Sequence, residues 1–237
     1  MIFTFLLVNK KLFETTTKYV IAHFSHKVKS FILFCNLFAL TFFKSFFFST
    51  KEVSLSGEFD VLFKGKGHFM ETIKISDEAL RLGAEEGMDG FLLVFIDKYL
   101  EVTGGVINAE TMPLLNGHQH TLLGYHFLRE ELNEGGFVQL IQNGYGPYIF
   151  DNPFAKAMRL FGLKEFSKLI YAAKKIYDAN KADLEKDRDD DEFMAMYEQY
   201  EVFDDLEEEF MEMEEYITAK LAEYVDEHLE YFAEIVE

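Results

Sequence analysis

The chain has 237 residues, with 42 acidic and 23 basic side chains, a formal net charge of -19 and a single Cys. One Cys excludes an intramolecular disulfide framework and a zinc site built from several thiolates. The acid excess excludes ordinary nucleic-acid binding, because a surface that neutralises phosphates needs clustered Lys and Arg.

The first 69 residues differ in composition from the rest of the chain. They hold nine Lys, four acids and 15 of the 27 Phe, so that residues 70–237 carry a net charge of -24. This composition is typical of translated A/T-rich noncoding DNA, and the codons of residues 64–67 would form a purine-rich run just before Met70. We therefore expect residues 1–69 to be a mis-assigned upstream translation and the native protein to begin at Met70.

A membrane anchor is the alternative for this segment. The 18 residues 31–48 contain one charged side chain and reach the lower limit of a membrane span. A secretory signal peptide is excluded, because the apolar run starts too late and no small-residue cleavage site follows it.

From Met70 onward the pattern predicts successive helices. Ser76 can cap a helix that runs through Leu82, and a second helix over 88–102 ends at a Thr-Gly-Gly sequence. A third helix over about 117–133 is stopped by Gly135 and Gly136, which favour a break in the backbone.

The chain then predicts a short helix with an apolar face, closed by Asn143-Gly144. Asn152 and Pro153 form a helix-start signal, with Asn as the cap, and that helix stops at Gly162. A long helix is expected over about 163–185. Because no run alternates apolar and polar residues over six positions, the predicted fold is all-α, a single multi-helix domain over 70–237.

The C-terminal part is predicted to form a long acidic helix. Its apolar residues recur at intervals of three and four, which places them on one buried face: Leu206, Phe210, Met213, Ile217, Leu221 and Tyr224. Residues 187–237 hold 21 acids and only two basic side chains, a net charge of -19.

This charge excess indicates a cationic partner. Glu208, Glu212 and Glu215 follow one another at helical spacing, and such like-charge pairs destabilise a helix by about 0.2–0.5 kcal/mol each. A solvated helix face is the simpler explanation, but solubility needs fewer acids, mixed with Lys. Carboxylates one turn apart are separated by about 5–6 Å along the axis, comparable to the phosphate spacing of a duplex. The predicted partner-binding residues are Asp189, Asp190, Asp191, Asp204, Asp205, Glu208, Glu212 and Glu215.

One motif resembles that of a known family. The segment 130–143 resembles the central motif of a bacterial helical domain family of unknown function, typified by an acidic DNA-mimic protein; its motif positions here are Asn133, Gly135, Gly136, Phe137, Gln139 and Asn143. The sequences at 161–164, 203–210 and 221–225 are similar to later parts of that family, so that the resemblance covers about 113–235. It implies an all-helical fold and a binding role without catalysis. The motif also has a purely structural explanation, in which the two glycines permit a tight turn, Phe137 anchors it and Asn143 caps it.

Metal binding is the main competing hypothesis. Asp187, Asp189, Asp191 and Glu198 occupy positions 1, 3, 5 and 12 of a calcium-loop template, but position 6 is Glu192, where the sharp turn needs Gly.

A second metal hypothesis involves histidines. His126 and Glu130 share a helix face, whereas His118 and His120 point elsewhere, so we expect surface or capping histidines there. No metal or cofactor is predicted.

No phosphate-binding loop or nucleophile elbow is present in the sequence, and we find no catalytic constellation. The sequence therefore predicts a non-enzymatic, cytoplasmic bacterial protein that does not bind nucleic acid directly. It would occupy the DNA-binding surface of a basic DNA-binding protein, such as a transcription regulator. The alternatives are a calcium-binding protein or metal-dependent enzyme using residues 187–198, and a membrane-tethered interaction protein. The sequence does not predict the oligomeric state.

Overall fold

The computed structural model describes residues 72–237, all of which belong to one unit, Leu55–Glu237. The predictions for residues 1–69 and for a start at Met70 lie outside the described residues. Within residues 72–237, no helix is both long enough and apolar enough to cross a membrane.

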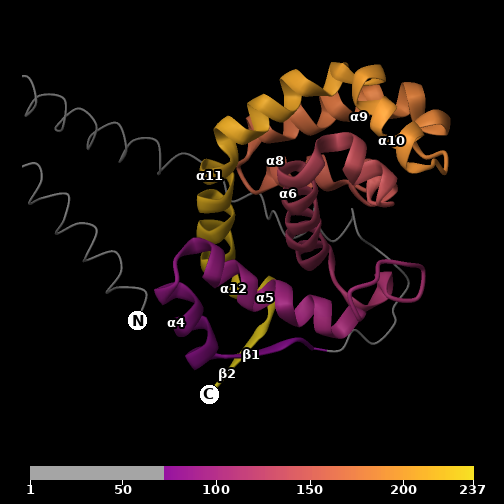
Figure 1. The fold of residues 1–237 in the computed structure, drawn as a ribbon. Helices are drawn as coiled ribbons and strands as arrows, with labels where there is room; N and C mark the ends of the chain where they lie inside the picture. The colour runs from indigo at the N-terminus through magenta and orange to yellow at the C-terminus, as the bar shows by residue number, and fades with distance from the viewer. Residues whose placement is uncertain (1–71) are drawn as a thin grey trace, which may run out of the picture. The chain divides into compact units, whose positions relative to one another are not determined.

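Helices make up most of the described chain, which confirms the predicted all-α class (Figure 1). In chain order the elements are β1 (Lys74–Ser76), α4 (Asp77–Glu85), α5 (Met88–Thr103), η1 (Met112–Leu114), α6 (Gly117–Gln142), α7 (Gly146–Phe150), α8 (Phe154–Leu160), α9 (Lys164–Leu184), α10 (Asp190–Gln199), η2 (Glu201–Phe203), α11 (Asp204–Glu227), α12 (Leu229–Phe232) and β2 (Glu234–Val236).

Local capping signals explain several helix ends. The Ser76 side chain accepts a hydrogen bond from the backbone N–H of Ala79, as predicted, and caps α4. Gly104 ends α5 in the left-handed conformation, with φ 62°. The predicted role of Asn152 was wrong, because its Nδ2 donates to the carbonyl oxygens of Pro147 and Tyr148. Asn152 thus satisfies carbonyl groups at the end of α7, and α8 begins without a side-chain cap.

The break predicted within α6 is present at Gly135 and Gly136. Gly135 has φ -166° and ψ 19°, and Gly136 has φ 75° and ψ -167°, so neither residue is helical. The helical hydrogen bonding resumes directly after them, and the predicted pair of helices is one element with a sharp kink.

The hydrophobic core lies under α11, which packs against α5, α6 and α9 (Figure 1). The predicted apolar face of α11 is confirmed, because Phe210, Ile217 and Leu221 are fully buried. Phe137, Leu140, Phe166 and Ile170, on the helices that meet it, are also buried. Leu206, in the first turn of α11, is only partly buried and packs at the margin of the core.

A short parallel sheet joins the start of the described chain to its C-terminus. Lys74 pairs with Glu234, Ile75 with Ile235 and Ser76 with Val236. No strand was predicted from the sequence, because three residues are too few to show an alternating pattern. The Tyr99 hydroxyl donates to the carbonyl oxygen of Phe232 at 3.0 Å, which ties the C-terminal segment to α5.

Candidate functional site

The structure places all eight predicted partner-binding acids at the surface. Asp189 accepts a hydrogen bond from the backbone N–H of Glu192 and so caps α10. The side chains of the other seven form no hydrogen bond or ion pair with any part of residues 72–237. The ion pairs of α11 use Glu214, Lys220 and Glu223 instead.

Five of these acids have a structural role within their own helices. Asp189 is the N-cap of α10, and Asp190 and Asp191 lie in its first turn. Asp204 and Asp205 lie in the first turn of α11. Acids at these positions are favourable, because the N-terminus of a helix carries partial positive charge.

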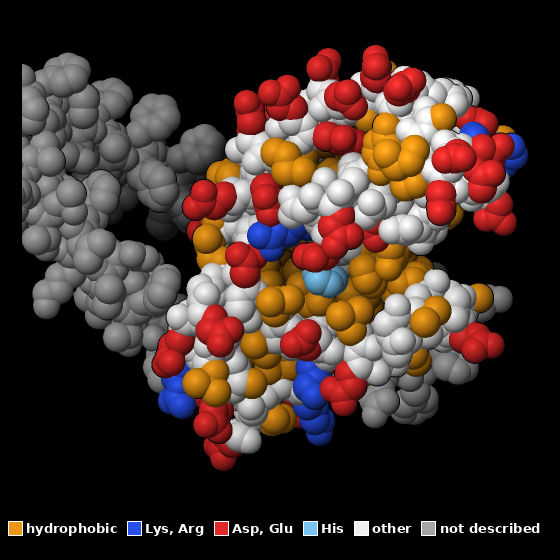
Figure 2. All heavy atoms as spheres, in the orientation of Figure 1, with side chains coloured by type: hydrophobic (Ala, Val, Ile, Leu, Met, Phe, Trp, Pro, Cys, Tyr) orange, Lys and Arg blue, Asp and Glu red, His pale blue; other side chains and the backbone are white. Residues whose placement is uncertain are grey.

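Glu208, Glu212 and Glu215 have no such role. They lie beyond the first turn of α11, all exposed and on one side of the helix. We call these three residues the acidic face of α11. Figure 2 shows acidic side chains gathered along the edge of the molecule that α10 and α11 form in Figure 1, with few basic side chains among them.

Two other acids of α11, Glu207 and Glu214, point inward. Glu207 accepts a hydrogen bond from the backbone N–H of Phe137 at 2.7 Å and lies directly against Gly136. Burial raises the pKa of the Glu207 carboxyl, although the hydrogen bond from Phe137 opposes that shift. The Gly-Gly-Phe turn therefore provides the surface on which the start of α11 docks.

Glu214 anchors the middle of α11. It pairs with Arg129 of α6, which also pairs with Asp89 of α5. Burial acts against the charge on Arg129, but the hydrogen bonds to Glu214 and Asp89 raise its pKa above the ordinary value. The seven-residue spacing of Glu207 and Glu214 was no signal in the sequence, because Glu208 and Glu215 have the same spacing and are exposed.

Two further motif residues, Gln139 and Asn143, stabilise the kink of α6. Gln139 donates through Nε2 to Glu131 at 3.0 Å, and Asn143 donates through Nδ2 to the same carboxylate at 2.8 Å. Asn143 is also the C-cap residue of α6, whereas Asn133 is exposed. Glu131 thus links the two halves of the kinked helix.

The expectation of surface histidines at the start of α6 was wrong. His120 is buried between the Tyr148 hydroxyl at 2.9 Å and the carbonyl oxygen of Met112 at 2.8 Å, and its burial lowers its pKa. His118 is buried and stacks on Tyr231, with ring centroids 4.6 Å apart. The C-terminal α12 packs against α6, and this long-range contact is absent from any local sequence pattern.

The described residues contain no group of three or more His, Cys, Asp or Glu side chains that could hold a metal ion. The calcium-loop hypothesis fails on backbone geometry, because Asp191 and Glu198 lie within α10 and not in a loop.

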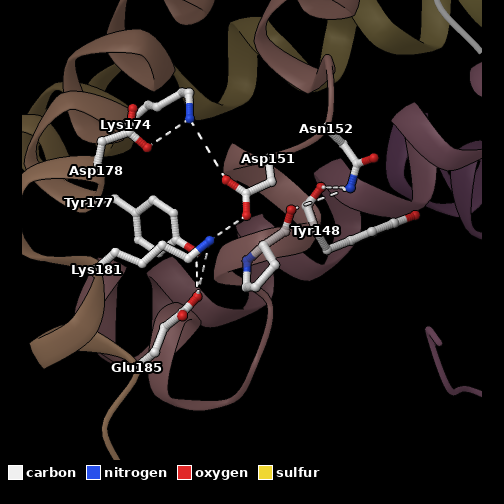
Figure 3. Close-up of polar contacts among 9 residues, drawn as sticks. Tyr148, Asp151, Asn152, Lys174, Tyr177, Asp178, Lys181 and Glu185 are labelled. Carbon is white, nitrogen blue, oxygen red and sulfur yellow. Dashed lines mark hydrogen bonds and ion pairs between the residues drawn. The ribbon is translucent and has the colours of Figure 1, made fainter. Parts of the chain in front are cut away.

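The acids beside α9 contrast with the acidic face of α11. Lys174 pairs with Asp178 at 2.8 Å, and Lys181 pairs with Asp151 at 2.5 Å (Figure 3). Tyr177 donates to Glu185 in the same cluster. Here the carboxylates are neutralised within the protein, whereas those of the acidic face of α11 form no ion pair with any of residues 72–237.

Comparison with known proteins identifies the family. The family described as DMP19-like protein matches residues 113–228. The DNA mimic protein DMP19 of Neisseria meningitidis serogroup B (strain ATCC BAA-335 / MC58) is 33% identical over 145 residues, which are 61% of this chain and 87% of that protein. The chain belongs to the DMP19-like family. The matched residues include the kink of α6 and the acidic face of α11, which confirms the resemblance inferred from the Gly-Gly-Phe motif.

Proposed function

We propose that this DMP19-like protein is a non-enzymatic DNA mimic of the bacterial cytoplasm, whose acidic face of α11 occupies the DNA-binding surface of a basic partner such as a transcription regulator. The observation that carries the proposal is that Glu208, Glu212 and Glu215 are exposed and unpaired in the middle of α11, in the part of the chain that the structure describes. The relative from Neisseria meningitidis, which is named a DNA mimic protein, supports the same role.

The energetics favour a partner over a merely solvated face. Each like-charge pair at this spacing destabilises α11 by about 0.2–0.5 kcal/mol. The inward acids of this helix have partners within the fold: Glu207 accepts a backbone hydrogen bond, and Glu214 forms an ion pair. The outward acids have no such compensation, and a cationic surface would relieve their repulsion.

The geometry agrees with a duplex-like arrangement of charge. Successive outward carboxylates of α11 are separated by about 5–6 Å along the helix axis, at a rise of about 1.5 Å per residue. One strand of DNA presents phosphates at about 3.4 Å, with the second strand interleaved. Asp189, Asp190 and Asp191 at the start of α10 extend the negative surface beyond α11.

The test replaces Glu208, Glu212 and Glu215 together by Gln. A DNA-binding protein is first captured on the immobilised wild-type chain and purified, and displacement of a labelled duplex from it is followed by fluorescence anisotropy. The Gln variant should bind the captured protein about tenfold or more weakly, a change of about 1.4 kcal/mol or more, and should no longer displace the duplex. Wild-type binding should weaken steeply with salt, because exposed charges are screened beyond about 8 Å at physiological ionic strength.

The matched control removes three other exposed acids by the same change to Gln: Glu78 and Glu85 of α4, and Glu86 directly after it. It reduces the net negative charge by the same three units, so its binding should stay close to wild type. Unchanged binding by the α11 variant, or a ternary complex with the DNA, would show that the acidic face of α11 is only a solvated surface.

A further inference from the structure

The acidic face of α11 is bordered by a pocket whose chemistry differs from that of its carboxylates. The pocket lies between the start of α9 and the middle of α11 and has a volume of about 240 Å³. Its walls include the apolar side chains of Leu163, Phe166, Met213 and Ile217, together with the oppositely charged pair Lys164 and Glu165. This volume is several times the roughly 30 Å³ that one water molecule takes up in the liquid.

Tyr216 lies at this pocket and beside the acidic face. It is 58% exposed, although it is one of the largest apolar side chains of α11. It follows Glu212 by four residues, so both side chains lie on the same side of the helix. Met211, which is 43% exposed, lies on the opposite flank of the acidic face. Tyr and Met are enriched in the cores of protein interfaces, where they contribute contact area that charge does not.

We propose that Tyr216 and this pocket bind an apolar side chain carried by a basic α-helix of the partner. The inference rests on the proposed function and deepens it, because it names the feature by which a protein is recognised in preference to a simple polycation. Charge complementarity defines the occupant: an apolar side chain that enters the pocket must be flanked by Lys or Arg to face Glu212 and Glu215. A basic amphipathic helix has this combination.

The two parts of the contact respond differently to salt. Attraction to the acidic face decreases as ionic strength rises. Burial of an apolar side chain is not screened in this way, because it depends on the area removed from water. Loss of a carboxylate should therefore change the salt dependence of binding, whereas loss of the Tyr216 ring should lower the affinity by the same factor at every salt concentration.

The experiment uses two synthetic helical peptides of about 18 residues, long enough to form helices. Both carry the same Lys and Arg residues, and they differ in having Leu or Gln on one face, two residues of similar helix propensity. Affinities for the full chain are measured by isothermal titration calorimetry at about 50 mM and about 300 mM salt, which span weak and strong screening.

The wild-type chain should prefer the Leu peptide by about tenfold, which corresponds to about 1.4 kcal/mol. Tyr216→Ala should abolish the preference, and Tyr216→Phe should retain it, because the ring remains. Tyr171→Ala is the matched control: Tyr171 is 44% exposed on α9 and does not line the pocket, so this change should leave the preference intact.

Equal affinity of the wild-type chain for both peptides would overturn the inference, as would a Leu preference that survives Tyr216→Ala. The triple Gln variant of the acidic face separates this failure from failure of the proposed function. If that variant binds both peptides more weakly while no Leu preference exists, the charge-based function stands and the pocket has no role. If it binds both peptides as wild type does, the proposed function falls and this inference falls with it.

Discussion

At the scale of single residues, the acids of α11 differ in what their carboxylates contact. Glu207 and Glu214 point inward and bind Phe137 and Arg129, respectively. Glu208 and Glu215, their immediate neighbours in sequence, are exposed. A uniform run of acids in the sequence is therefore two functional sets, one that holds the helix in place and one that is free to contact a partner.

Replacing Glu207 by Ala should destabilise the fold. The change leaves the backbone N–H of Phe137 without its acceptor next to the kink of α6. An unsatisfied buried donor costs about 1–3 kcal/mol, measured as the free energy of unfolding in urea. A loss comparable to that of Glu208→Ala, an exposed neighbour, would show that the Glu207 contact does not hold α11.

The Glu207→Gln variant should differ from wild type in the pH dependence of its folding stability. Burial raises the pKa of Glu207 above its ordinary value of 4.5, so the folded state binds this proton more tightly than the unfolded state. Its contribution to stability is therefore complete below the ordinary pKa and is lost as the pH rises through the folded-state pKa. Gln keeps an oxygen acceptor for Phe137 but does not ionise. The stability of the Gln variant relative to wild type should increase as the pH rises above the ordinary value of 4.5, and a constant or falling difference would contradict the assignment.

At the scale of elements, α11 supports both the core and the proposed interface. Its inner face packs against α5, α6 and α9, and its outer face carries the exposed acids. Core truncation should therefore affect stability without changing the charge of the outer face.

Phe210→Ala should cost about 3–5 kcal/mol, the range for removing a buried Phe side chain. Phe210 is fully buried and lies 6.0 Å from Phe166 between ring centroids. Leu206→Ala provides the comparison, because Leu206 is on the same face but only partly buried, and it should cost less. Chemical denaturation measures both, and an unchanged unfolding midpoint for Phe210→Ala would mean that the core face of α11 is assigned incorrectly.

At the scale of the molecule, the β1–β2 pairing brings together the two ends of the described chain. Ile75 of β1 and Ile73, directly before this strand, are 2% and 5% exposed and contribute to the core. We propose that residues 70–237 form an autonomous domain, since the described elements from β1 onward enclose this core.

A chain that begins at Met70 should thus fold completely and unfold in one cooperative transition by circular dichroism. A chain that begins at Leu80 should be markedly less stable, because it lacks β1 and the capped start of α4. Intact mass of the natively expressed protein tests the start itself. Native peptides from residues 31–48, or a Met70 chain that fails to fold, would refute the proposed boundary.

The sequence by itself determined the features that depend on neighbouring residues. The 3.6-residue periodicity placed Phe210, Ile217 and Leu221 on one buried face, and Ser76, Gly104 and the Gly135-Gly136 pair marked breaks in the chain. These signals succeed because helix propensity, capping and apolar spacing act within a few residues. The family motif and the acid excess could also be identified from the sequence, because each lies within a short continuous segment.

The tertiary structure alone decided which polar groups meet across the fold. The Phe137 N–H donates to Glu207, one of a run of similar acids, 70 residues away in sequence. The C-terminal segment covers His118 at the start of α6. Asn152 ends α7, and three-residue strands pair across the length of the domain. Such partners are set by how the helices pack, because a buried donor or acceptor must be satisfied by whichever group the fold brings near. The outward acids of α11 satisfy no buried donor of the fold, so their carboxylates stay exposed.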